Sequence, residues 1–337
     1  MNELHKFIFD GLPVRGHLVR LTEGWQEVLR RRAGAGQAWP QPVRELLGEM
    51  TVAAVLMQAN LQFEGALILQ VYGDGPVKLA VAEVQADLAF RATATTVGEV
   101  EPGAGLAELL QCAGAGRCAI TLDPGAGQVG HAPGHQSGRQ PGRQPYQGVV
   151  SLSDAQGAPF ASVSKVLEHY MRQSEQLETR LVLAANEEAA CGLLIQRLPV
   201  LGAANLGGQA AVADEASEAA SDEAFRRIAL LTATLTREEL LGLDADTLLR
   251  RLYWEEPLRR FALGNSAPRF ECRCSRGRVG RMMVRLGRAE VDDILAEQGR
   301  VDVACEFCAL QYRFDSVDVG ELFTPARDQI PPSASIN

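Results

Sequence analysis

The chain has 337 residues, a net charge of −9, and hydrophobic (46%) and charged (22%) contents near globular averages, so it is long enough for more than one folded domain. The acidic balance argues against a protein that coats nucleic acid with its whole surface. No apolar run reaches the roughly 18 residues of a membrane-spanning helix, and residues 1–21 lack the apolar core of a signal peptide, so we expect a cytoplasmic protein in a reducing compartment.

Residues 1–201 mix helical and strand patterns without regular β–α–β alternation, which favours an α+β core domain for substrate binding and dimerisation. Apolar residues at helical spacing predict the helices, and β-rich runs between turn sequences predict the strands. The expected elements are a helix at 43–61, an antiparallel hairpin around the turn GDGP at 73–76, strands near 84–94, 116–127, 146–153, 179–184 and 191–199, and a helix beginning at 162.

Two stretches have low sequence complexity. Residues 125–148 are rich in Gly, Pro and Gln with a tandem GRQP, which predicts a mobile surface loop, expanded at 125–145. Its His131 and His135 could form a metal pair, but a solvated loop is the favoured interpretation. Residues 202–224 are small, polar and acidic, which is typical of a linker.

A helical connector is expected at 224–262, where leucines recur at helical spacing among many charges. Its segments LLTATL and LLGL would be adhesive if a packed partner released them. The predicted organisation is a core domain at 1–201, an acidic stretch plus helical linker at 202–264, a C-terminal module at 265–325 and a tail at 326–337.

The C-terminal module carries four cysteines in two pairs, Cys272 and Cys274 in CRC and Cys305 and Cys308 in CEFC. Two short helices, ended by Gly287 and Gly299, are expected between the pairs, and a hairpin at 300–315 should carry CEFC in its turn. Four thiolates complete the tetrahedron that zinc prefers in structural sites, so we expect one zinc ion held by these four residues. The same residues also allow a zinc ion that only stabilises the fold and has no regulatory role.

Zinc would dominate the stability of so small a module. A structural zinc ion contributes about 10–16 kcal/mol of apparent binding energy, whereas a core of ~60 residues supplies only ~3–5 kcal/mol. Seven arginines lie at 269–288 with Glu271 as the only acid, a setting that favours reactive thiolates. A sulfur in a disulfide cannot ligate zinc, so oxidation would release the metal. The scattered Cys112, Cys118 and Cys191 are interpreted as small apolar residues.

The sequence resembles the heat-shock protein 33 family of redox-regulated bacterial holdase chaperones. The resemblance rests on CRC and CEFC and on four further segments: LQFEGALILQVYGDGP (61–76), YQGVVSL (146–152), LEHYMRQSEQLETRLVLAA (167–185) and GLLIQRLP (192–199). It implies that the reduced, zinc-bound form is inactive. It also implies that peroxide or hypochlorous acid forms the Cys272–Cys274 and Cys305–Cys308 disulfides, releases zinc and destabilises the connector.

The resemblance further implies a function in the oxidative stress response. The oxidised form, often a homodimer, would bind unfolding client proteins without ATP and pass them to ATP-dependent chaperones. No Walker-type nucleotide motif occurs in the sequence, which agrees with action without ATP. Neither nucleic acid nor a membrane is an expected partner.

Two other functions are compatible with a four-cysteine zinc site or with its neighbouring residues, and each meets an objection. A zinc-ribbon nucleic-acid-binding protein with a purely structural zinc is the alternative, supported by the arginine cluster and opposed by the net charge. A zinc hydrolase is disfavoured because four thiolates leave no open position for water. Glu168, His169 and Glu175 lie on an expected helix without a further catalytic partner, so no catalytic residue is predicted and the protein is not expected to be an enzyme.

Overall fold

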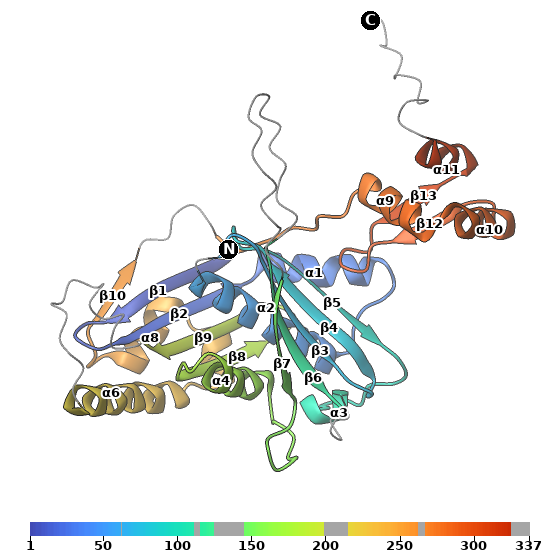
Figure 1. The fold of residues 1–337 in the computed structure, drawn as a ribbon. Helices are drawn as coiled ribbons and strands as arrows, with labels where there is room; N and C mark the ends of the chain where they lie inside the picture. Colours follow the sequence, from blue (N-terminus) through green and yellow to red (C-terminus); the bar gives the residue numbers. More distant parts are fainter. Residues whose placement is uncertain (62, 111–114, 125–144, 199–214, 262–266, 325–337) are drawn as a thin grey trace, which may run out of the picture. The chain divides into compact units, whose positions relative to one another are not determined.

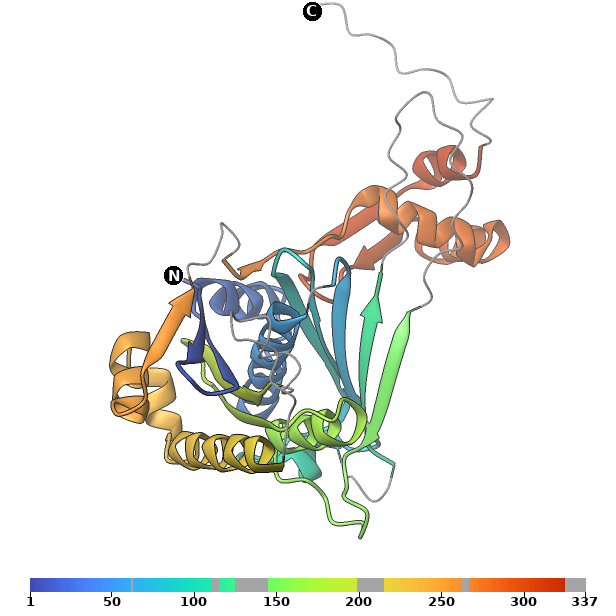
Figure 2. The same cartoon turned by 60° about the vertical axis from the view of Figure 1, so that its left-hand side comes forward.

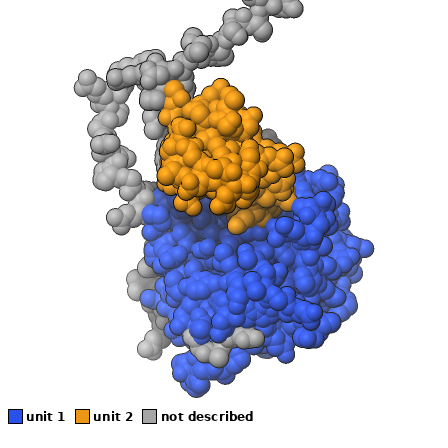
Figure 3. All heavy atoms as spheres, turned by 90° about the vertical axis from the view of Figure 1, so that its right-hand side faces the viewer, with its two compact units in different colours: residues 1–271 blue, residues 272–337 orange. Residues whose placement is uncertain are grey.

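The computed structural model describes residues 1–61, 63–110, 115–124, 145–198, 215–261 and 267–324. The chain divides into two compact units, Met1–Glu271 and Cys272–Asn337, which Figure 3 draws in different colours. Each is described by itself below. Cys112, His131, His135, most of the expected 125–148 loop, residues 202–214 and the tail lie outside the described residues.

The first sheet of unit 1, sheet A, is antiparallel with the strand order β10-β1-β2-β9-β8. Strands β8 and β9 confirm the predicted strands, whereas β1, β2 and β10 were not predicted. Their bounds are β1 Glu3–Phe9, β2 Val14–Leu21, β8 Thr179–Ala185, β9 Ala190–Arg197 and β10 Leu258–Phe261.

The second sheet, sheet B, has the order β11-β5-β4-β3-β6-β7, and only the short β11 runs parallel to its neighbour. The predicted hairpin around 73–76 is confirmed as β3–β4. The bounds are β3 Ala66–Tyr72, β4 Val77–Val84, β5 Ala89–Thr96, β6 Arg117–Asp123, β7 Tyr146–Ser151 and β11 Arg269–Phe270. Mixed α and β elements with two sheets confirm the α+β class.

Helix α2, Gln41–Asn60, lies between the two sheets (Figure 2) and confirms the predicted 43–61 helix. It is buried nearly all round, as a helix covered on both sides must be. Glycine allows the close approach: a Cβ on Gly48 would lie 2.4 Å from that of Ala185, and one on Gly192 would lie 2.4 Å from Val52. The other helices of this part are α1 Glu23–Gly34, α3 Leu106–Leu110 and α4 Val163–Ser174.

The connector forms three helices, α6 Glu215–Ala233, α7 Arg237–Gly242 and α8 Ala245–Tyr253, which lie against the face of sheet A opposite α2 (Figure 1). They close a second core in which Phe9 and Tyr253 meet edge to face at 5.0 Å. Two expectations were wrong here. Helix α6 begins at Glu215, inside the stretch interpreted as a linker, and residues 258–261 form β10 instead of helix because they pair with β1.

Unit 2 contains helices α9 Arg276–Leu286, α10 Arg288–Gln298 and α11 Ser316–Phe323 and the hairpin of β12 Val301–Ala304 with β13 Gln311–Phe314. The two predicted helices and the predicted hairpin are confirmed, and Gly287 and Gly299 close the helices at positive φ. The core of this unit is small: its buried residues are Met283, Val291, Val301, Cys308, Tyr312, Phe314 and Val319. Across the described part of the whole chain, no helix is both long and apolar enough to cross a bilayer.

Candidate metal centre

The loop between β12 and β13 presents Cys305 and Cys308. Two backbone hydrogen bonds close it, from Cys305 N–H to the carbonyl of Leu310 at 2.9 Å and from Ala309 N–H to the carbonyl of Cys305 at 2.7 Å. Ala309 adopts a left-handed φ of 59°, which the tight turn requires. The loop therefore points both sulfurs to one side, as its CxxC spacing predicts.

Cys272 and Cys274 lie in extended chain just before α9. The helix begins at the Ser275 cap, whose hydroxyl accepts a hydrogen bond from Arg278 N–H at 3.3 Å. Helix α9 packs closely on α11, since a Cβ on Gly280 would come within 2.6 Å of Leu322. The helices between the two cysteine pairs thus return the chain so that the CxC segment faces the CxxC loop.

The four sulfurs form one cluster. The Sγ atoms of Cys272 and Cys305 are 3.6 Å apart, those of Cys274 and Cys308 are 3.3 Å apart, and all four lie within 4.8 Å of one another. A disulfide needs about 2.05 Å, so these are free thiols. A zinc ion with Zn–S bonds of about 2.3 Å requires tetrahedral sulfurs roughly 3.8 Å apart. The donor set and spacing fit a single zinc ion.

Hydrogen bonds within the cluster give its thiols different pKa values. The bond from the Cys272 thiol, aided by the backbone N–H groups of Cys308 and Phe307, lowers the pKa of Cys305 to about 4. Donating that bond raises the pKa of Cys272. Cys305 is therefore the first thiolate of the cluster, and four neighbouring thiolates together need a cation to compensate their charge.

Two of the arginines expected to activate the thiols have other partners. Arg276 pairs with Asp318 at 2.6 Å and covers the ring of Phe314 at 4.2 Å, and Arg288 pairs with Asp292 at 2.9 Å. Hydrogen bonding, and not the arginines, accounts for the acidity of Cys305. These ion pairs also remove part of the positive charge that supported a nucleic-acid-binding alternative.

Cys118, Cys191 and the candidate acid–base residues Glu168 and His169 have structural roles. Cys118 and Cys191 are buried, and burial raises the pKa of Cys118 to about 12 and that of Cys191 to about 11, which makes both unreactive. Glu168 accepts a hydrogen bond from the N–H of Leu181, and His169 stacks at 5.1 Å on Phe160. These residues belong to unit 1, whereas the sulfur cluster belongs to unit 2.

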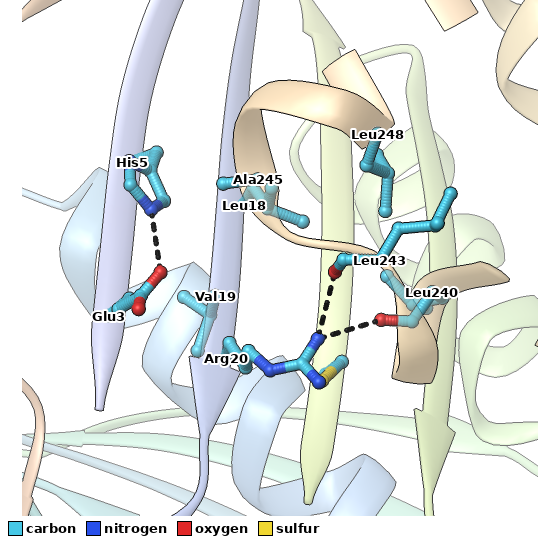
Figure 4. A pocket seen from close by; sticks show the side chains of 10 residues that line it. Glu3, His5, Leu18, Val19, Arg20, Leu240, Leu243, Ala245 and Leu248 are labelled. Carbon is cyan, nitrogen blue, oxygen red and sulfur yellow. Dashed lines mark hydrogen bonds and ion pairs between the residues drawn. The ribbon is translucent and has the colours of Figure 1, made fainter. Parts of the chain in front are cut away.

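Arg20 on β2 fixes the connector to sheet A (Figure 4), a role that no local sequence pattern indicates. Its guanidinium donates hydrogen bonds to the carbonyl of Leu243 at 3.0 Å and, more weakly, to that of Leu240 at 3.5 Å, and it also bonds the carbonyl of Leu241. These carbonyls end α7, where a helix has unpaired acceptors and partial negative charge. The contact joins residues more than 200 positions apart, so local patterns could not reveal it.

Arg237 fixes the other end of α7. It pairs with Glu45 of α2 at 2.8 Å and donates a hydrogen bond to the carbonyl of Ala185 on β8. Glu49, one turn further along α2, also faces this guanidinium, and burial raises its pKa to about 7. Helix α7 is thus held by charge as well as by apolar contact, and α6 is held likewise by an ion pair between its Asp222 and Arg197 of β9.

Comparison with known proteins finds related chains. The model of a family described as "Hsp33 protein" matches residues 2–315. The 33 kDa chaperonin of Chromobacterium violaceum is 42% identical over 96% of this chain and 94% of its own length, and that of Methylobacillus flagellatus is 38% identical over the same shares. The crystal structure of the 33 kDa chaperonin from Thermotoga maritima, 19% identical, superposes with a TM-score of 0.66 over 96% of this chain and 98% of that one.

Proposed function

Because the chain belongs to the Hsp33 family, whose members are chaperones and not enzymes, we propose that it is a redox-regulated holdase of the cytoplasm. It binds client proteins as they unfold, and oxidation of the sulfur cluster turns this activity on. The observation that carries the proposal is the cluster itself, four thiols within 4.8 Å of one another in a unit with a very small apolar core.

In the reduced form, Cys272, Cys274, Cys305 and Cys308 would hold one zinc ion. When bound, zinc supplies the positive charge that lets all four sulfurs remain thiolates side by side, and so fixes the hairpin to the CxC segment. The low pKa of Cys305 and the fit of the sulfur spacing support this ligand set. In this proposal residues 265–325 are the redox-switch domain.

Oxidation removes the ligands. Each cysteine pair gives two electrons to one molecule of hydrogen peroxide, which takes up two protons and leaves as two waters while an S–S bond forms. We assign the bonds to Cys272–Cys274 and Cys305–Cys308 from the family resemblance, since the sulfur distances alone permit other pairings. Disulfide sulfurs carry no charge and no longer hold a metal cation.

The client-binding surface would come from the connector and the face of sheet A that it covers. Residues 202–264 form the proposed linker, and residues 1–201 the proposed core domain. Release of α6, α7 and α8 would expose Phe9, Leu193 and Ile195 on the sheet and the leucines of the helices together. An apolar surface of this kind binds unfolded chains without ATP. Dimerisation on oxidation and hand-over of clients to ATP-dependent chaperones complete the proposal.

An aggregation assay tests the function. A chemically unfolded client is diluted into buffer with reduced, zinc-loaded protein or with peroxide-treated protein, while a chromophoric chelator records released zinc. We expect protection only after oxidation and in step with zinc release. Equal protection in both forms would refute the switch, and protection in neither would refute the chaperone.

Tryptic mapping tests the disulfide assignment, because Arg273 lies between Cys272 and Cys274. Trypsin places the four cysteines in peptides 270–273, 274–276 and 301–313. The proposed bonds join the first two peptides to each other and leave the third alone, lighter by two hydrogens. Bonds between the two motifs would instead join 301–313 to the other peptides and would overturn the assignment.

A further inference from the structure

A cavity of about 320 Å³ opens in unit 1 between the two sheets, beside α4 and the end of α2. Such a volume is within the range of small-molecule sites. One wall is apolar, and the other carries Arg15 of β2 and Gln196 of β9. The apolar lining includes Met57, Leu67, Ile120, Leu122 and Met171. No cysteine stands among the described residues that line this cavity, and the four cysteines of the proposed redox switch lie in unit 2.

The polar wall holds a cation without an acidic partner. Among the described residues Arg15 forms no ion pair. Lys6, a second cation, lies beside Arg15 and pairs in register with His17, whose pKa burial lowers to about 3, so that this histidine is neutral. The Lys6 ammonium is already bonded to the carbonyl of Ala59 at the end of α2, at 2.5 Å. Burial lowers the pKa of Arg15, as expected for a charge removed from water without a counter-ion.

The hydrogen bonds of Arg15 are also incomplete. Its Nε and Nη2 both donate to Gln196 Oε1, at 3.1 and 2.5 Å, and Asn60 Nδ2 donates to that same oxygen at 2.9 Å. A carbonyl oxygen has two lone pairs, so three donors exceed its capacity, while a guanidinium has five N–H groups to satisfy. Three donors thus share one oxygen, although Asn60 Oδ1 beside them is buried without a donor. The positive charge of Arg15 and its N–H groups that do not bond to Gln196 are the complement of a carboxylate.

From this geometry we infer that the cavity binds a small amphiphilic anion, a carboxylate on an unbranched apolar body. The carboxylate accepts hydrogen bonds from Arg15, a geometry in which the guanidinium can donate two parallel bonds. The apolar body lies along Leu67, Ile120 and Met171. The one carboxylate of the lining, Glu175, already accepts a hydrogen bond from Tyr170 at 2.7 Å.

Octanoate is the probe, and 1-octanol and octylammonium are its neutral and cationic counterparts. Reduced, zinc-loaded full-length protein is titrated by calorimetry, below the concentration at which the probe forms micelles. We expect octanoate to bind at one site and the other two to bind at least about tenfold more weakly, because only octanoate offers acceptors and negative charge to Arg15. Equal binding of all three, or tighter binding of octylammonium, would refute anion recognition.

Methionine methyl signals locate the bound probe. Met57 and Met171 line the cavity, whereas Met282 is 49% exposed on α9 and reports non-specific adsorption. In protein labelled with ¹³C-methyl methionine, octanoate should shift the first two signals and leave that of Met282 in place. Shifts at Met282 alone, or at all three together, would contradict a site in the cavity.

Three variants complete the test. Arg15→Gln should weaken octanoate about tenfold or more, and Arg172→Gln, the same charge change at an exposed position of α4, should not. Leu122→Trp keeps Arg15 but fills the cavity, so it should abolish binding even if Arg15→Gln does not fold. Thermal unfolding of each variant verifies its fold. Unchanged affinity in a folded Leu122→Trp protein, or equal loss in Arg172→Gln, would overturn the proposal.

Discussion

The two units of this chain are held together in different ways. Unit 1 buries α2 between two sheets and closes a second core under the connector, so its fold is stabilised by apolar area. Unit 2 buries few apolar side chains and brings four thiols within 4.8 Å of one another. The comparison teaches that, under the proposed function, loss of the metal would unfold unit 2 and leave unit 1 folded.

Loss of a metal ligand should have the largest effect. We expect Cys305→Ser to lose bound zinc and with it on the order of 10 kcal/mol of folding energy in unit 2. Hydrogen exchange should show loss of amide protection in α9, α10 and α11, and protection in β3 and β4 should persist. The buried Cys191→Ala is the matched control, and it should keep the metal. Full protection of unit 2 without metal would show that its apolar core suffices.

Deletion of a buried side chain should lower the folding stability of unit 1 but the zinc affinity of unit 2. Leu47→Ala in α2 and Met283→Ala in α9 each remove a buried side chain and should each cost about 2–5 kcal/mol. In Leu47→Ala this cost should appear in chemical denaturation of unit 1, with zinc affinity unchanged. In Met283→Ala it should appear as weaker zinc affinity, because folding and metal binding are linked there. Unaltered zinc affinity in Met283→Ala would contradict this coupling.

The partly buried Glu49 should make the stability of unit 1 depend on pH. Its pKa rises from 4.5 to about 7 by burial, with Arg237 of α7 opposing and Glu45 adding to the rise. Below about pH 4.5 both folded and unfolded chains hold the proton and no penalty exists. Between pH 4.5 and 7 the unfolded chain loses this proton while the folded chain keeps it, so stability falls by about 1.4 kcal/mol per pH unit and by about 3 kcal/mol in all; above pH 7 both forms are ionised and the loss is complete.

Glu49→Gln tests this expectation. The variant should gain stability over the unmodified chain at pH 8 but not at pH 4.5, as measured by urea denaturation at each pH. Glu188→Gln, at an exposed position, is the control for loss of one carboxylate. A stability difference of the same size at both pH values would contradict the assignment of the titration to Glu49.

Loss of the hydrogen bonds from Arg20 to the end of α7 should have the smallest effect on stability. Arg20→Gln removes hydrogen bonds to the carbonyls that end α7 and should cost about 1–2 kcal/mol. Amide exchange in α7 should accelerate, and client protection should begin at a lower peroxide dose. Arg250→Gln, an exposed position on α8, should change neither. An unchanged dose in Arg20→Gln would show that this contact does not hold the connector closed.

Local sequence patterns predicted the elements whose signals are themselves local. Helix α2 has the apolar spacing, the β3–β4 hairpin has the turn sequence, and Gly299 ends α10 at a positive φ. The candidate metal centre was also predicted, since CxC and CxxC place two sulfurs each by backbone geometry alone. Strand β10 was missed because its sequence LRRF has no strand signal of its own and becomes a strand by pairing with β1.

By itself the sequence determined the α+β class, the four thiols in two tight pairs, and the family, because these depend on residue identity and short spacing. The tertiary structure alone decided that Arg20 and Arg237 hold α7 against sheet A, that the thiol of Cys272 acidifies Cys305, and that Arg15 faces a cavity without an acidic partner. Each of these facts is a contact between residues far apart in the chain, and such contacts exist only once burial has excluded water and fixed both partners.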